Sequence, residues 1–268
     1  MATDTTSGTA ALRFANLTFS YRREPFIRDF GLAVHEGLVT GIIGPNGCGK
    51  STLTRLAVGL ERPQSGEVLI EGRPTLSFKP RERARHLAYL TQGGNQPAMS
   101  VEGLVACGRF PSHGHQGPLD AHDRALVDEA MRRCGVERFR DVDVRRLSGG
   151  ERQRAFIAMT LAQDTRIIVL DEPTTFLDVH ACHETMLLLR QLNRNDGKTV
   201  VVIIHDLDLA LRYSDRLAVM THGRLLQEGT VPEVLASRAI EEAFHVSVHP
   251  NPAPAPDASP SYSLHPTM

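Results

Sequence analysis

Tryptophan is absent from this 268-residue chain, and aromatic residues of all kinds make up only 5% of it. Lysine is scarce too, with Lys50, Lys79 and Lys198 as the only three. The four cysteines are widely spaced and form no CxxC pair, which argues against a disulfide framework and a zinc ribbon. The longest apolar runs, such as 200–204, are far shorter than the ~18 residues of a membrane span, so we expect no such span.

An excess of either charge is also lacking. Lys and Arg total 30, Asp and Glu total 31, and the net charge is −1, so we expect no nucleic-acid partner. The first ten residues lack a basic region followed by an apolar one, and we therefore expect no secretory signal, a cytosolic protein and reduced thiols. The composition, 41% hydrophobic and 23% charged, is that of a folded soluble chain of one large or two modest domains.

Apolar patterning predicts an α/β fold. Two alternating stretches near the start predict half-buried antiparallel strands: Leu17, Phe19 and Tyr21, then Phe30, Leu32 and Val34. Three nearly continuous aliphatic runs suit strands covered on both faces: 39–43, 167–170 and 200–204. Helical spacing separates them at about 50–58, 120–134, 150–162 and 180–192. This alternation indicates a sheet with crossover helices.

The organisation along the chain is that of one folded unit, residues 11–249, between two tails. Residues 1–10 are small and polar, and 250–268 are rich in Pro, Ala and Ser, so both are expected to be flexible. The stretch 101–146 has helical spacing without a strong strand. With its flanks, about 95–162, it is predicted to form an inserted helical subdomain.

The segment from Gly44 to Ser51, GPNGCGKS, matches the GxxxxGK(S/T) phosphate loop between a predicted strand and a predicted helix. Glycines let successive backbone N–H groups point inward, and the helix adds its positive end. Lys50 would contact the β- and γ-phosphates, and Ser51 would complete magnesium coordination. Alone, the loop is common to GTPases, kinases, helicases and transport ATPases.

Two further strands end in polar residues that suit the same site. The strand at 167–170 ends in Asp171, a candidate magnesium ligand, and Glu172, a candidate base for the attacking water. The alternative is that this strand simply ends in a charged turn. The strand at 200–204 ends at His205, where α/β folds place ligands, although a lone histidine there is usually structural.

The segment LSGGERQR, residues 147–154, is the most specific. Ser148 and Glu151 form a capping box at the start of a helix, but this does not explain Gly149 and Gly150, which let backbone N–H groups approach an anion. With GPNGCGKST upstream and IIVLDEP downstream, the chain from about residue 12 to 248 resembles the ATPase subunit of ATP-binding cassette (ABC) transporters.

The resemblance implies a P-loop ABC cassette: a RecA-like mixed sheet, an N-terminal antiparallel β subdomain and the helical subdomain. It implies ATP and Mg²⁺ as cofactors. Tyr21 resembles the aromatic residue that stacks on adenine, Gln92 a ligand of magnesium or water, and His205 the contact of the γ-phosphate. Asp178 lies in the loop that crosses to a partner subunit. The implied nucleotide-binding residues are Tyr21, Gly44, Pro45, Asn46, Gly47, Cys48, Gly49, Lys50, Ser51, Thr52, Ser148, Gly149, Gly150 and Asp178; Ser51, Gln92 and Asp171 are the metal ligands and Glu172, His205 and Gln92 the catalytic residues.

In this family two cassettes sandwich two ATP molecules, so the implied partners are a second copy, two membrane permease subunits and an extracytoplasmic binding protein. The expected location is the cytoplasmic face of the bacterial inner membrane. GRFP at 108–111, TTFLD at 174–178 and HDLDLALRYSDRL from His205 resemble importers of ferric siderophores. Thr91 departs from the branch, where proline is frequent, and so does Phe176, which replaces another aromatic or small residue.

Haem or cobalamin import, and a non-transport role such as iron–sulfur assembly, are the alternatives. Other clusters carry plainer interpretations. His180, Cys182 and His183 are taken as a solvated helix rather than a metal site. No chemical role is assigned to His113 and His115. The run Lys79, Arg81, Arg83 and Arg85 is taken as a solvated surface.

Overall fold

A computed structural model describes residues 10–22, 24–93, 96–113, 118–251 and 261–266. Its centre is a six-stranded sheet in the order β10-β9-β3-β8-β7-β6. All neighbours in it are parallel except β10, which pairs antiparallel with β9. The predicted α/β fold with a mixed sheet is confirmed. The strands of this sheet are β3 (Val39–Ile43), β6 (Leu87–Leu90), β7 (Ile167–Asp171), β8 (Thr199–Ile203), β9 (Arg216–Thr221) and β10 (Arg224–Thr230).

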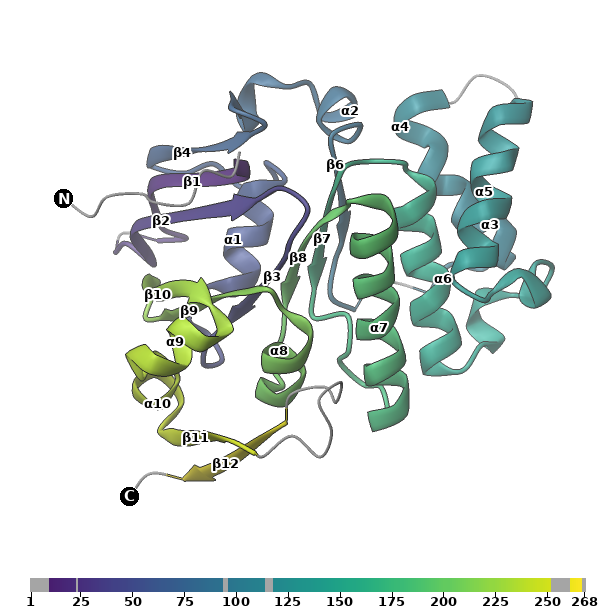
Figure 1. Ribbon diagram of the computed structural model, residues 1–268. Helices are drawn as coiled ribbons and strands as arrows, with labels where there is room; N and C mark the ends of the chain where they lie inside the picture. Colours follow the sequence, from purple (N-terminus) through teal and green to yellow (C-terminus); the bar gives the residue numbers. More distant parts are fainter. Residues whose placement is uncertain (1–9, 23, 94–95, 114–117, 252–260, 267–268) are drawn as a thin grey trace.

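A four-stranded sheet in the order β2-β1-β4-β5 covers one face of the central sheet (Figure 1). Its strands are antiparallel, as predicted, and are β1 (Ala10–Phe19), β2 (Ile27–His35), β4 (Ser65–Ile70) and β5 (Arg73–Pro74). Alternate residues of β3 divide between two cores: Ile42 packs with β1, β2 and α1, whereas Val39 and Ile43 pack on the opposite side. Burial on both faces is why the central strands have continuous aliphatic runs.

The four predicted helices are present and begin within one residue of the predicted positions, and α7 extends to Asp196 rather than to 192. The longer ones are α1 (Lys50–Ala57), α5 (Ala121–Arg133), α6 (Gly149–Ala162) and α7 (Val179–Asp196). The shorter ones are α2 (Pro80–Arg83), α3 (Val101–Ala106), α4 (Phe110–His113), α8 (Leu207–Tyr213), α9 (Val231–Ser237) and α10 (Ala239–Phe244). Short 3₁₀ turns are η1 (Thr75–Ser77), η2 (Cys107–Arg109), η3 (Glu137–Phe139) and η4 (Val144–Arg146).

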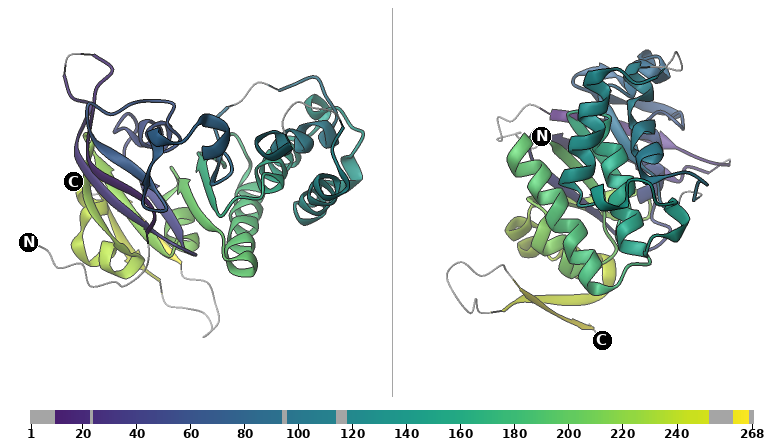
Figure 2. Two further views of the ribbon diagram at one scale, coloured as in Figure 1. Left: turned by 90° about the horizontal axis from the view of Figure 1, so that it is seen from above. Right: turned by 90° about the vertical axis from the view of Figure 1, so that its right-hand side faces the viewer.

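Helices α3, α4, α5 and α6 gather at one side of the central sheet, and both views in Figure 2 show them together. Val105, Met131 and Ala158, from α3, α5 and α6, are buried in their shared core. These helices lie within residues 95–162, the range expected for the helical subdomain, whose bounds stay a prediction.

The end of the chain differs from the prediction of a flexible tail over 250–268. Strand β12 (Tyr262–Pro266) pairs antiparallel with β11 (Val246–Pro250), and Tyr262, Val246 and Val248 pack against the main core. Cross-strand pairing with β11, which itself packs on the core, orders residues 262–266. Residues 1–9, 252–260 and 267–268 lie outside the described part, and Ala10 already belongs to β1. Within the described part, no helix combines the length and apolar character of a membrane span.

Candidate nucleotide site

The phosphate loop runs from β3 into α1 and depends on glycines with positive φ. Gly44, Gly47 and Gly49 have φ values of 159°, 77° and 111°. A Cβ at Gly44 would lie 2.1 Å from the carbonyl oxygen of Met220, so only glycine fits there. Gly49 is the N-cap of α1, and the helix begins at Lys50. The free N–H groups of its first turn therefore border the loop, which favours an anion.

Lys50 is only 4% exposed, although it carries a charge. Its Nζ donates to the carbonyl oxygens of Gly44 at 2.8 Å and Pro45 at 3.1 Å, and Cys48 Sγ lies 4.0 Å away. Among the described residues no carboxylate forms a salt bridge with it. A buried ammonium with only neutral acceptors favours the arrival of an anion such as phosphate. Burial raises the pKa of the Cys48 thiol, so that cysteine is held neutral.

Asp171, the last residue of β7, is surrounded by hydroxyl groups. Ser51 Oγ donates to Asp171 Oδ1 at 3.0 Å, and Thr54 Oγ1 and Tyr89 Oη each lie 3.4 Å from Oδ2. Burial is the main reason why the pKa of Asp171 is raised. A carboxylate beside a serine hydroxyl is an oxygen donor set that Mg²⁺ prefers, and a cation there would compensate the buried charge. These residues therefore fit a magnesium ion.

Glu172 has a φ of 53°, unusual for a residue other than glycine, and its carboxylate is held from three sides. Gln92 Nε2 donates to Oε2, His205 Nε2 contacts Oε1, and Thr175 Oγ1 donates to Oε2 at 3.1 Å. A cavity of about 410 Å³ brings this group together with the phosphate loop. Its lining is Phe26, Asn46, Gly47, Gly49, Lys50, Ser51, Thr52, Gln92, Glu172 and His205.

Tyr21 lies at the rim of the loop, with its hydroxyl 3.1 Å from Thr52 Oγ1. Its ring is 55% exposed and packs at right angles on Phe19, with 4.7 Å between centroids. Phe26 is a further neighbour at 5.9 Å. The alternation pattern was wrong in placing Tyr21 within the first strand, because β1 ends at Phe19.

The glycine-rich LSGGERQR segment opens α6 with the predicted capping box. Ser148 Oγ accepts from the Glu151 amide at 3.4 Å, and the Glu151 carboxylate accepts from the Ser148 amide at 3.0 Å. The Ser148 hydroxyl also donates to the Glu151 carboxylate at 2.7 Å, and this bond first, then the bond from the Ser148 amide, lowers the pKa of Glu151. Gly149 and Gly150 pack closely on the next segments, since a Cβ on Gly150 would lie 3.1 Å from Ala181 Cβ. None of the three residues Ser148, Gly149 and Gly150 lines the cavity at Lys50.

Asp178 is likewise absent from the lining of that cavity. It is the N-cap of α7 and accepts from the Ala181 amide at 2.8 Å. Beside it, Phe176 is 94% exposed with a φ of 65°, and Val179 is 76% exposed. One chain therefore brings the phosphate loop together with Gln92, Glu172 and His205, and it leaves Ser148 and Asp178 out of that cavity. Gly149 lines a separate cavity of about 380 Å³ that also borders Gln92, Asp171 and Glu172.

The other histidine clusters have separate structural partners. His183 Nδ1 lies 2.9 Å from the Tyr213 hydroxyl, and His180 contacts Glu184 at 3.3 Å. His113 lies 2.9 Å from Asp123, a residue that also pairs with Arg109. His115 lies outside the described residues.

Sequence reasoning missed Phe26, Thr54, Tyr89 and Thr175, which support the predicted residues. Thr54 follows Ser51 by one helical turn, so helical spacing was an available signal. Tyr89 is partly buried in β6 and ends in a hydroxyl, which needs a partner. Phe26 and Thr175 had no comparable local signal.

Comparison with known proteins agrees with this geometry. The ABC transporter family model matches residues 27–175. The chain is 39% identical to the petrobactin import ATP-binding protein FpuD of Bacillus anthracis, over 88% of this chain and 87% of that protein. Identity is 38% with the ferric enterobactin transport ATP-binding protein FepC of Escherichia coli (strain K12), over 89% of each.

A solved structure with a similar fold is the dimeric ATP-binding cassette MJ0796 in a post-hydrolysis state, bound to ADP and Pi. It has a TM-score of 0.72 and 29% identity and covers 82% of this chain and 98% of its own. The family match spans more than half of the chain, and it includes β3, the phosphate loop, the α6 start and β7. The chain therefore belongs to the ABC transporter family.

Proposed function

We propose that this ATPase powers the import of a ferric siderophore through a separate membrane permease. The observation that carries its chemistry is the cavity in which Glu172, Gln92 and His205 face the phosphate loop. The import role is supported by relatives named for petrobactin and ferric enterobactin transport. The ATPase would act at the cytoplasmic face of the inner membrane, with two permease subunits and an extracytoplasmic binding protein.

In the proposed reaction, Lys50 and the loop amides bind the β- and γ-phosphates. Glu172 accepts a proton from water, whose oxygen forms a bond to the γ-phosphorus while the bond to the β,γ-bridging oxygen breaks and ADP leaves. His205 and Gln92 orient the Glu172 carboxylate. A magnesium ion, when bound by Ser51, Asp171 and Gln92, supplies charge neutralisation to the phosphates.

We further propose that ATP binds between two copies of the chain. The start of α6 and Asp178 do not line the cavity at Lys50 in their own chain, yet Gly149 and Gly150 free backbone groups for an anion. The exposed Phe176 and Val179 beside Asp178 offer apolar surface that a second copy would cover. Each nucleotide would then contact Lys50 of one copy and Ser148 of the other.

The first test replaces the proposed base. Glu172→Gln should retain ATP binding and lower turnover by about 10²- to 10⁴-fold, the usual contribution of general-base chemistry. It should also accumulate an ATP-bound dimer on gel filtration. Glu67→Gln, an exposed change on β4, serves as the matched control and should behave like the wild type. Unchanged turnover in Glu172→Gln, together with a monomer in ATP, contradicts the proposal.

The cargo requires a cellular measurement. A strain lacking the gene should fail to grow on a ferric siderophore as its sole iron source, and the wild-type gene should restore growth. A gene encoding Lys50→Ala should not restore it, because the phosphates would lose their close cation. If siderophore uptake is unchanged while haem or cobalamin uptake is lost, the cargo assignment changes to that compound.

A further inference from the structure

Two arginines at α2 join the core of the molecule to its helical subdomain. Arg81 donates from Nε to the carbonyl oxygen of Pro111 at 2.9 Å and from Nη2 to that of Ser112 at 3.0 Å. Arg85 reaches the same two carbonyls, at 2.9 Å and 3.5 Å. Lys79, Arg81 and Arg85 are exposed, as expected for a solvated surface, but the two arginines also make these backbone contacts. Only Arg83 departs from the expectation, because it is partly buried and burial lowers its pKa.

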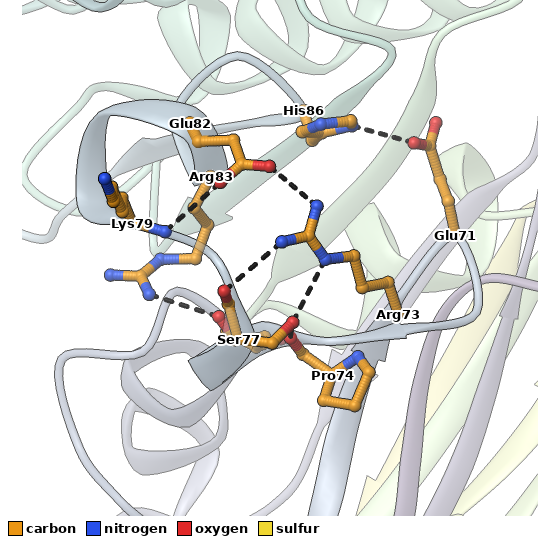
Figure 3. A network of polar contacts seen from close by, with 9 residues as sticks. Glu71, Arg73, Pro74, Ser77, Lys79, Glu82, Arg83 and His86 are labelled. Carbon is orange, nitrogen blue, oxygen red and sulfur yellow. Dashed lines mark hydrogen bonds and ion pairs between the residues drawn. The ribbon is translucent and has the colours of Figure 1, made fainter.

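The α2 segment is itself fixed to the antiparallel sheet, as Figure 3 shows with Arg73 of β5 bonded to Glu82 of α2. Arg73 binds Glu82 at 2.6 Å and lies 4.0 Å over the ring of Phe78. On the same helix, Arg83 donates to the Thr75 carbonyl at 3.3 Å. Arg81 and Arg85, four residues apart, both extend towards α4, where they reach the Pro111 carbonyl oxygen. The α2 segment, residues 80–85, thus connects the antiparallel sheet to α4, and we call it the bracket.

Beyond the bracket, buried contacts continue to the far end of α6. His113, the last residue of α4, contacts Asp123 of α5 at 2.9 Å. Asp123 binds Arg109 Nε at 2.8 Å, and Arg109 Nη1 donates to the Ala162 carbonyl at 2.6 Å. Asp123 and Arg109 are both buried and Ala162 is the last residue of α6. The connection from α2 to α6 is therefore continuous.

A second joint lies at the same end of α6. Gln163, its C-cap, donates to the carbonyl oxygens of Ala84 at 2.5 Å and Leu87 at 3.2 Å, next to α2 and at the start of β6. Both joints thus hold the C-terminal end of α6, whereas Ser148 lies at its N-terminal end. The 14-residue helix is about 21 Å long, so a rotation of about 5° at the joints moves its start by about 2 Å.

We infer that Arg81 and Arg85 are positioning residues for ATP hydrolysis, which set the orientation of α6 and hence of Ser148 at the start of the helix. The inference rests on the proposed nucleotide site between two copies. Displacement of a site group by about 1 Å is enough to change rates by about 10²-fold. Loss of the bracket should therefore weaken the contact that Ser148 makes with nucleotide on the second copy, while the phosphate loop of the same chain keeps its ATP.

The test removes both guanidinium groups in a chain whose ATP hydrolysis is already slowed by Glu172→Gln. Arg81→Gln with Arg85→Gln, in the Glu172→Gln background, should raise the ATP-dependent dimer dissociation constant about tenfold or more, given the sensitivity of site geometry. ATP affinity of the monomer should stay within about twofold of that of Glu172→Gln, because neither Arg81 nor Arg85 lines the Lys50 cavity. Arg132→Gln with Arg224→Gln removes the same charge from exposed positions and should leave dimerisation unchanged.

Replacing both arginines with lysine distinguishes the effect of charge from that of hydrogen-bond geometry. Arg81→Lys with Arg85→Lys keeps both charges but loses the planar two-pronged donation, so it should recover only part of the dimer affinity. Failure of Glu172→Gln itself to dimerise contradicts the proposed function, whereas equal dimerisation with and without the arginines overturns only this inference. If the double variant does not fold, each single glutamine variant is measured, and wild-type dimerisation in both also overturns it.

Discussion

At the scale of single residues, backbone conformation decides where the chemical groups of the site lie. Glu172 adopts a φ of 53° directly after β7, whose last residue is Asp171. Such a conformation costs about 1–2 kcal/mol outside glycine and persists because the surrounding contacts fix it. Gln92, His205 and Thr175 supply those contacts. Strain at this position agrees with a functional assignment.

Gly44 allows a test of steric restriction in the phosphate loop. Gly44→Ala places a Cβ 2.1 Å from the Met220 carbonyl oxygen, whereas Gly47→Ala meets nothing within 4 Å, although both positions have positive φ. Both should lose about 1–2 kcal/mol through backbone strain, and Gly44→Ala should lose a further 1–3 kcal/mol or so through overpacking. Urea unfolding monitored by circular dichroism measures the difference. Equal free energies of unfolding in the two variants would disprove this steric account.

Most of the proposed ATP-site residues could be predicted from sequence, because motif spacing carries them. Lys50, Ser51, Asp171 and Glu172 stand at strand ends or in a fixed loop, so the parallel sheet necessarily brings them together. The contact of Tyr89 with Asp171 could not be predicted, because a hydroxyl in a partly buried strand indicates that it has a partner but not which distant residue supplies it.

At the scale of elements, hydrophobic periodicity predicted the long helices, whereas the short elements β12 and α2 depend on strand pairing and polar contacts. Helices α5 and α6 were predicted nearly to their ends, whereas α7 extends past its predicted end at 192. Of their caps Asp120, Ser148 and Asp178, only Ser148 was recognised from the sequence. Strand β12 was missed because its order depends on pairing with β11, which no local pattern reveals. The four-residue α2 is likewise held by Arg73 and Glu82 rather than by periodicity.

The capping box of α6 should make stability depend on pH. Hydrogen bonds from Ser148 hold the pKa of Glu151 below its ordinary value of 4.5, so the folded state favours the carboxylate. This stabilisation is complete above pH 4.5 or so and is lost as pH falls through the lowered pKa. Glu151→Gln keeps a capping amide but cannot titrate. Between about pH 5 and 3 it should lose less unfolding free energy than the wild type in denaturant titrations. An equal loss in both proteins over this pH range would contradict the role of Glu151 in the capping box.

At the scale of the whole molecule, the proposed site needs two copies, and mixed variants can test this. Lys50→Ala damages the phosphate loop, and Ser148→Arg damages the α6 start. A heterodimer of the two places both lesions in one site and leaves the other with intact Lys50 and Ser148. Mixing should restore roughly a quarter of wild-type ATPase activity, because half the dimers would each hold one intact site of two. Full activity of Ser148→Arg alone would rule out the role of Ser148.

The strand order of the central sheet has a consequence for the order in which the chain folds. Strand β3 is paired on both sides with late strands, β8 and β9, with Val39 opposite Val200 and Thr40 opposite Arg216. At about 5 to 20 residues per second, a ribosome takes on the order of ten seconds or more to make the intervening roughly 160 residues. During that time the apolar β3 has two open edges, and the phosphate loop lacks its supporting neighbour Met220. We expect nascent chains that stop before β8 to lack the nucleotide site and to be prone to aggregation.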